Sequence, residues 1–85
     1  MPKVEIYTTS RCPYCIQAKN LLAEKGVVFE EKQLDNDPET RRWLVTASGQ
    51  KTVPQVFVDG KPYGGFSDIA ALDEAGKLDA ILGLH

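Results

Sequence analysis

The stretch VEIYTTSRCPYCIQAKNLLAEKG, residues 4–26, decides the fold of this chain. Its first four residues, VEIY, are a β-prone run, and the polar residues TTSR close that run. From Pro13 to Lys25 the apolar side chains recur at helical spacing, and Gly26 follows as a stop signal. The stretch therefore predicts a short strand that leads directly into a helix.

The next part of the chain continues this alternation. Residues 27–34 include the apolar pair Val28 and Phe29 and predict a second strand. Because strand, helix and strand form a βαβ unit, this strand should lie parallel to the first. Asp37 suits the cap of a second helix over residues 38–48, which begins with proline, a residue favoured at the first helical position.

The last third of the chain predicts two antiparallel strands and two helices. Strands are expected at 55–58 and 61–63, because the Asp59-Gly60 dipeptide between them is typical of a tight hairpin turn. Helices are expected at 66–75 and 78–82. The predicted order, β-α-β-α-β-β-α, describes an α/β fold with a mixed four-stranded sheet flanked by helices.

Composition limits the size and the partners of this protein. Eighty-five residues with 42% hydrophobic and 26% charged side chains suit one small domain, which we place over residues 1–85. Ten basic and twelve acidic residues give a net charge of −2, which argues against a nucleic-acid-binding module. No apolar run reaches the ~20 residues of a membrane span, and charge near the N-terminus argues against a signal peptide. We therefore expect a cytoplasmic protein.

The two cysteines, Cys12 and Cys15, lie where the first strand passes into the first helix. Small secreted domains that depend on disulfides carry more cysteines, and a bridge across three positions closes too short a loop to stabilise a fold. The N–H groups and the dipole at a helix N-terminus favour a thiolate. We therefore expect Cys12 to attack a disulfide and to leave readily from a mixed disulfide. Cys15, one turn inside the helix and more shielded, is expected to resolve that intermediate.

Two other roles, a purely structural one and a zinc site, explain the cysteine pair less well than redox chemistry does. Free cysteines are often buried as small apolar side chains, but C-x-x-C spacing at a strand-to-helix junction favours redox chemistry. A zinc site needs about four ligands, and His85 is the only other soft ligand in the sequence. We therefore expect no metal site.

Three motifs, in this order and spacing, resemble those of dithiol glutaredoxins, and most closely the short bacterial form. They are Cys-Pro-Tyr-Cys at 12–15, Thr-Val-Pro at 52–54 and Gly-Gly-Phe-Ser-Asp at 64–68. The resemblance covers essentially the whole chain and implies the thioredoxin fold. It also implies a glutathione-dependent oxidoreductase that reduces protein disulfides and glutathione mixed disulfides. Glutathione would be a co-substrate with no permanently bound cofactor, and the partners of the monomer would be disulfide-containing or glutathionylated proteins.

The resemblance further implies a glutathione-binding groove beside Cys12. Backbone groups of Val53, which precedes a cis-Pro54, would pair with the cysteinyl part of glutathione as an added strand pairs with a sheet edge. The N–H groups of Ser67 and Asp68 would take the α-carboxylate of glutathione, and the Asp68 side chain its ammonium group. The further groove residues that it implies are Arg11, Tyr14, Arg41 (toward the glycyl carboxylate), Thr52 and Gly65.

Some of these residues also fit purely structural roles that involve no ligand. Tyr14 fits a partly exposed surface aromatic, and the 52–54 segment fits a loop that enters a strand. The glycine pair followed by Ser67 fits a helix cap. We interpret Trp43, which is unusual in its helix, only as a packing residue or an exposed fluorophore.

The sequence departs from the family pattern at two places. Residues 8–11 lack the lysine that many relatives carry before the first cysteine, and Phe66 replaces a third cysteine of several relatives.

Two alternative functions remain open from the sequence. One alternative is a carrier of a glutathione-ligated iron–sulfur cluster that bridges two protomers. Such relatives mostly have Cys-Gly-Phe-Ser, so Pro13 and Cys15 disfavour this function. The other alternative is a redoxin served by thioredoxin reductase, which the implied glutathione groove disfavours.

Overall fold

The order of helices and strands follows the sequence prediction. The computed structural model describes residues 2–84, so His85, considered above as a metal ligand, lies outside the described residues. None of the helices within 2–84 has the length and apolarity needed to cross a membrane. The elements are β1 (Val4–Thr8), α1 (Pro13–Glu24), β2 (Phe29–Gln33), α2 (Pro38–Ser48), β3 (Gln55–Val58), β4 (Lys61–Gly64), α3 (Phe66–Glu74) and α4 (Leu78–Ile81).

The four strands form one mixed sheet in the order β2-β1-β3-β4. Strand β1 pairs parallel with β2 and antiparallel with β3, and β3 pairs antiparallel with β4. The two central strands, β1 and β3, are buried along their whole length. The edge strand β2 has the sequence FEEKQ, whose charges protect an exposed sheet edge from pairing with another chain.

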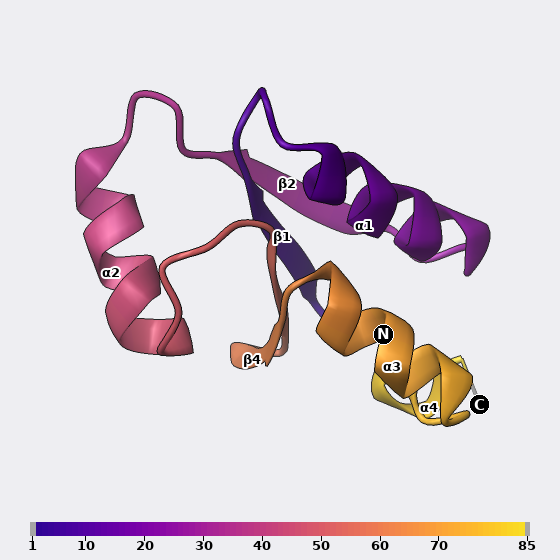
Figure 1. Cartoon of the computed structure of the whole chain (residues 1–85). Helices are drawn as coiled ribbons and strands as arrows, with labels where there is room; N and C mark the ends of the chain where they lie inside the picture. The colour runs from indigo at the N-terminus through magenta and orange to yellow at the C-terminus, as the bar shows by residue number, and fades with distance from the viewer. Residues whose placement is uncertain (1, 85) are drawn as a thin grey trace.

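Helices cover both faces of the sheet, with α1 and α3 on one face and α2 on the other (Figure 1). Alternate residues of a strand point to opposite faces, so β1 contributes to two separate cores. The larger core includes Ile6 with Leu22 of α1 and Ile69 of α3. The smaller core includes Tyr7 with Leu44 of α2. The predicted four-stranded mixed sheet with flanking helices is confirmed.

The second strand is shorter than the sequence predicted. Strand β2 begins at Phe29, and Val28, which we expected within the strand, is 86% exposed. The reason lies in the end of α1, where the N–H of Val27 still donates a hydrogen bond to the carbonyl of Leu22, at 3.2 Å. This hydrogen bond is typical of a helix that ends at a left-handed glycine, here Gly26 with φ +72°. Residues 27–28 therefore belong to the helix end and the loop.

The turn from β4 into α3 depends on two glycines and one carboxylate. Gly64 has φ +97°, and a Cβ atom there would collide with the carboxylate of Asp68. That carboxylate accepts a hydrogen bond from the N–H of Gly65, at 2.9 Å. A Cβ at Gly65 would lie 3.2 Å from the carbonyl oxygen of Pro54. The start of α3 is thereby held close to the loop that precedes β3.

Gly64→Ala should destabilise the protein through both backbone strain and contact with Asp68. Strain at a positive φ alone costs about 1 to 3 kcal/mol. Gly26→Ala is the matched control, because Gly26 also has a positive φ, +72°, but a Cβ atom there would meet nothing within 4 Å. Denaturant unfolding measures both losses, and we expect the larger one for Gly64→Ala. Equal losses would contradict the close packing of Asp68 against Gly64.

Candidate active site

Cys12 is the N-cap residue of α1, as the sequence predicted. Its sulfur accepts a hydrogen bond from the N–H of Cys15, at 3.2 Å, and its carbonyl accepts one from the N–H of Ile16, at 3.3 Å. Pro13 occupies the first turn, where its missing N–H costs nothing. The first-turn N–H groups and the helix dipole therefore favour negative charge on the sulfur of Cys12.

The two free thiols differ strongly in their surroundings. Cys15 is 1% exposed, whereas Cys12 is only half-buried. Burial, helped by the hydrogen bond with Cys12, raises the pKa of Cys15 to about 12, although the nearby charge of Lys19 acts in the opposite direction. The expected difference in shielding is thus confirmed. Within the described residues, no group of three or more His, Cys, Asp or Glu side chains could hold a metal ion.

Strand pairing brings three distant segments to one end of the sheet. Tyr7, near the end of β1, pairs with Gln55, the first residue of β3, because these strands are antiparallel. Gly64, the last residue of β4, pairs with Val56 near the start of β3. The loop before α1, the loop before β3 and the turn into α3 therefore meet at this end.

A groove of about 310 Å³ opens where these segments meet. The thiol of Cys12 lies beside it and donates to the carbonyl of Val53, at 3.5 Å. The peptide bond between Val53 and Pro54 is cis, as the family resemblance implied. The lining residues that the sequence indicated are Tyr14, Thr52, Val53, Pro54, Gly65, Ser67 and Asp68, and those that it missed are Gln50 and Phe66.

The first turn of α3 presents backbone donors to this groove. The first hydrogen bond of the helix runs from the N–H of Ile69 to the carbonyl of Gly65, at 3.1 Å. The N–H groups of Ser67 and Asp68 precede it and are suited to bind an anion. The N-cap is Gly65, so the capping role considered for Ser67 is wrong, and its hydroxyl is not needed to begin the helix.

Gln55 is a buried positioning residue that the sequence patterns did not reveal. It is fully buried, and its amide nitrogen donates to the side-chain oxygen of Gln50, at 2.9 Å, and to the carbonyl of Thr52, at 3.0 Å. These hydrogen bonds hold the loop that forms one wall of the groove. A glutamine at the start of the otherwise apolar strand QVFV was the signal that could have identified it.

Arg11 and Arg41 do not line the groove. Both are exposed, and Arg41 lies close enough to Asp35 for its charge to help lower the pKa of that carboxyl. The larger causes of the lowered pKa of Asp35 are hydrogen bonds from the N–H of Ser10, at 3.1 Å, and from its hydroxyl, at 2.8 Å. Asp35 thus connects the loop before Cys12 to the start of α2. The sequence did not reveal this role, because an aspartate just before a predicted helix is already explained as part of the helix start.

The exposed aromatic rings of Tyr14 and Trp43 have different environments. Tyr14 is 61% exposed and stacks on Phe66, with 6.4 Å between ring centroids, at the edge of the groove. Trp43 is 48% exposed and stacks on Phe57, with 5.7 Å between centroids, on the sheet face that α2 covers. Trp43 therefore packs against the smaller core and has no place in the groove.

Comparison with known proteins identifies close relatives of this chain. The Glutaredoxin family model matches residues 4–63. Glutaredoxin of Pseudomonas aeruginosa is 52% identical over 82 residues, which cover 96% of this chain and 98% of that protein. Glutaredoxin 3 of Escherichia coli is 48% identical over 82 residues, covering 96% and 99%. The crystal structure of a buckwheat glutaredoxin–glutathione complex is similar at a TM-score of 0.91 and 28% identity, covering 96% of this chain and 77% of that chain.

The difference between the two thiols predicts selective alkylation. Iodoacetamide at pH 7 should modify Cys12 and leave Cys15 intact, because Cys15 is 1% exposed and its pKa is raised. Mass spectrometry of Cys15→Ser should show one adduct, and Cys12→Ser should show none in the same time. Both variants should react fully once unfolded, which controls for the reagent. Faster labelling of Cys12→Ser than of Cys15→Ser would reverse the assignment.

Proposed function

The chain belongs to the glutaredoxin family and is a glutathione-dependent thiol–disulfide oxidoreductase, and we propose that Cys12 is its nucleophile and Cys15 its resolving thiol. The observation that carries this assignment is the unequal access to the two sulfurs. Cys12 is half-buried at the edge of the groove, whereas Cys15 is 1% exposed beneath it. An incoming disulfide can therefore meet Cys12 first.

With a glutathionylated protein, one cysteine is sufficient. The Cys12 thiolate attacks the glutathione sulfur, the protein thiolate leaves and takes a proton from solvent, and glutathione is now bound to Cys12 by a disulfide. The thiolate of a second glutathione attacks the sulfur of the bound one, which releases oxidised glutathione and the Cys12 thiolate. Because the N-terminus of α1 favours negative charge on Cys12, that sulfur is a good leaving group in the second step.

With a protein disulfide, both cysteines act. Cys12 attacks one sulfur of the substrate, which releases the other as a thiol and forms a mixed disulfide. The Cys15 thiolate then attacks the sulfur of Cys12, so that the substrate leaves fully reduced and the enzyme retains a disulfide between its two cysteines. Two glutathione molecules reduce this disulfide and leave as oxidised glutathione.

The groove is proposed to bind glutathione through backbone groups. Its lining supports pairing of the cysteinyl part with Val53, and contact of the α-carboxylate with the N–H groups of Ser67 and Asp68. One oxygen of the Asp68 carboxylate is engaged by Gly65, which leaves the other for the ammonium group. From outside the groove, Arg41 is proposed to attract the glycyl carboxylate and Arg11 to add positive charge beside the nucleophile.

We propose that the enzyme acts as a monomer in the cytoplasm on disulfide-containing or glutathionylated proteins. A monomer is supported by the charged edge strand β2, which disfavours pairing of the sheet with a second chain. The cytoplasm is supported by the reducing glutathione pool that this reaction consumes. The family relationship favours this oxidoreductase over a cluster carrier or a partner of thioredoxin reductase.

Serine variants separate the two cysteine roles. Cys15→Ser should keep reduction of a small glutathione mixed disulfide and lose reduction of a protein disulfide. Cys12→Ser should lose both activities by about a hundredfold or more, because the nucleophile is removed. Consumption of NADPH in an assay coupled to glutathione reductase measures both. Retained deglutathionylation by Cys12→Ser would contradict the assignment, and equal rates with thioredoxin reductase as the reductant would contradict glutathione dependence.

The resolving step should accelerate with pH. Burial, the largest cause, raises the pKa of Cys15, so its thiolate fraction near neutral pH is small. That fraction grows about tenfold for each pH unit. Release of glutathione from protein glutathionylated at Cys12, without free glutathione, should therefore accelerate by up to about tenfold per unit between about pH 7 and pH 9. Cys15→Ser, which cannot form the disulfide, is the control, and a flat pH profile would contradict this account.

A further inference from the structure

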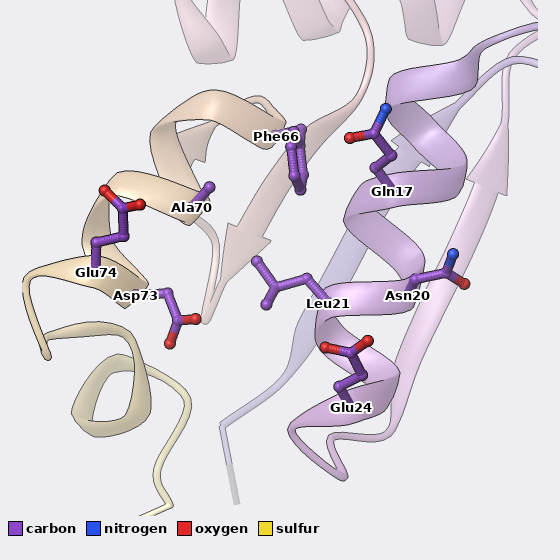
Figure 2. A pocket seen from close by; sticks show the side chains of 8 residues that line it. All are labelled: Gln17, Asn20, Leu21, Glu24, Phe66, Ala70, Asp73 and Glu74. Atoms are coloured by element: carbon purple, nitrogen blue, oxygen red, sulfur yellow. The ribbon is translucent and has the colours of Figure 1, made fainter.

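A second groove, of about 360 Å³, lies between α1 and α3 (Figure 2). Its lining changes in character along its length. Phe66 and Gln17 lie at one end, and toward the other lie Glu24 on the α1 side and Asp73 and Glu74 on the α3 side (Figure 2). The apolar lining residues are Leu21, Phe66 and Ala70, and the polar ones are Gln17, Asn20, Glu24, Asp73 and Glu74.

This α1–α3 groove continues from the proposed glutathione groove. The ring of Phe66 lines both grooves, and it stacks on Tyr14 with 6.4 Å between centroids. The α1–α3 groove therefore adjoins the proposed glutathione groove, which Cys12 borders through its contact with Val53. Along α1, the rise from Cys12 to Glu24 is about 18 Å, the length of about five residues of extended polypeptide. A substrate segment bound at Cys12 is thus long enough to reach the acidic end within about five residues.

The acidic end of the α1–α3 groove carries negative charge that the fold does not neutralise. Lys25 forms ion pairs with Asp73 and Asp79, and these pairs raise the pKa of Lys25. Asp73 therefore shares the single positive charge of Lys25 with Asp79. Glu24 and Glu74 are exposed, and none of the ion pairs within residues 2–84 involves either of them. The two glutamates are free to meet a cation from outside.

We propose that the α1–α3 groove docks a lysine or arginine side chain of the protein substrate, a few residues from the substrate's reactive cysteine. The proposal rests on the function proposed above, because it places this second contact on a substrate held at Cys12. The aliphatic part of the basic side chain would cover Leu21 and Phe66, while its cation would lie in the negative field of Glu24 on the α1 side and Glu74 on the α3 side. The apolar floor, the acidic end and the continuity with the reaction site together match this chemistry.

The expected effect is modest and confined to larger substrates. Exposed ion pairs are individually weak and screened by salt. Two of them should together change kcat/KM about three- to tenfold at low ionic strength. A glutathione mixed disulfide of free cysteine does not extend beyond the reaction site, so its reduction should be independent of this groove.

The test uses glutathionylated peptides of one sequence that differ only in carrying lysine or glutamate four to six residues to either side of the cysteine. The wild type should prefer the lysine peptide about three- to tenfold in kcat/KM. The double variant Glu24→Gln/Glu74→Gln should lose this preference. The matched control Glu30→Gln/Glu39→Gln, which removes two exposed carboxylates elsewhere, should keep it. All three proteins should reduce the mixed disulfide of glutathione with free cysteine equally.

Two results would overturn the groove assignment while the proposed function stands. One is an unchanged lysine preference in Glu24→Gln/Glu74→Gln. The other is an equal loss of preference in the control variant, which would assign the effect to net charge. Failure of the wild type to reduce the mixed disulfide of free cysteine would instead contradict the proposed function itself, and the groove proposal with it.

Discussion

The hydrogen bond from the N–H of Cys15 to the sulfur of Cys12, at 3.2 Å, is the interaction on which the site depends. It makes a sulfur, rather than the usual oxygen, the N-cap of a helix, so the reactive group is also part of the secondary structure. Cys15 itself lies one turn inside the helix, where its side chain is 1% exposed. The start of α1 thus leaves the Cys12 thiol accessible beside first-turn N–H groups, while burial raises the pKa of Cys15 and keeps that thiol protonated in reserve.

Two helix N-termini face the same groove, and this arrangement explains how an acidic protein can bind an anionic peptide. The chain has a net charge of −2, but α1 directs its positive end at the Cys12 sulfur and the first turn of α3 faces the groove. Backbone dipoles therefore supply the local positive potential. The carboxylates of Glu24 and Glu74 lie farther along, between α1 and α3, so glutathione and a basic substrate side chain would contact surfaces of opposite polarity.

Local patterns predicted the elements well, and their failures have local causes too. The cap at Asp37 and the strand at 55–58 are where the sequence predicted them, since caps, turns and short apolar runs are decided by neighbouring residues. The sequence analysis wrongly placed Val28 in the second strand. An apolar side chain does not reveal the hydrogen bond at the end of α1, after which β2 begins only at Phe29. Asp35 was missed because its partner, Ser10, becomes a neighbour only in the folded chain. Gln55 was missed because no recognisable sequence pattern marks its hydrogen bond to the loop before β3.

By itself, the sequence determined the chemistry of this protein: a cysteine pair at a strand-to-helix junction, with the proline and glycine motifs that accompany it in glutaredoxins. Only the tertiary structure decided how these parts combine. Antiparallel pairing of β1 with β3 and of β3 with β4 places the three motifs at one end of the sheet, and the packing of α1 beside α3 creates the second groove. The physical reason is the sequence distance over which each interaction acts. Helix caps and helix dipoles act within one helical turn. A groove exists only where strand pairing and a shared core hold together segments that are about forty to fifty residues apart in the sequence.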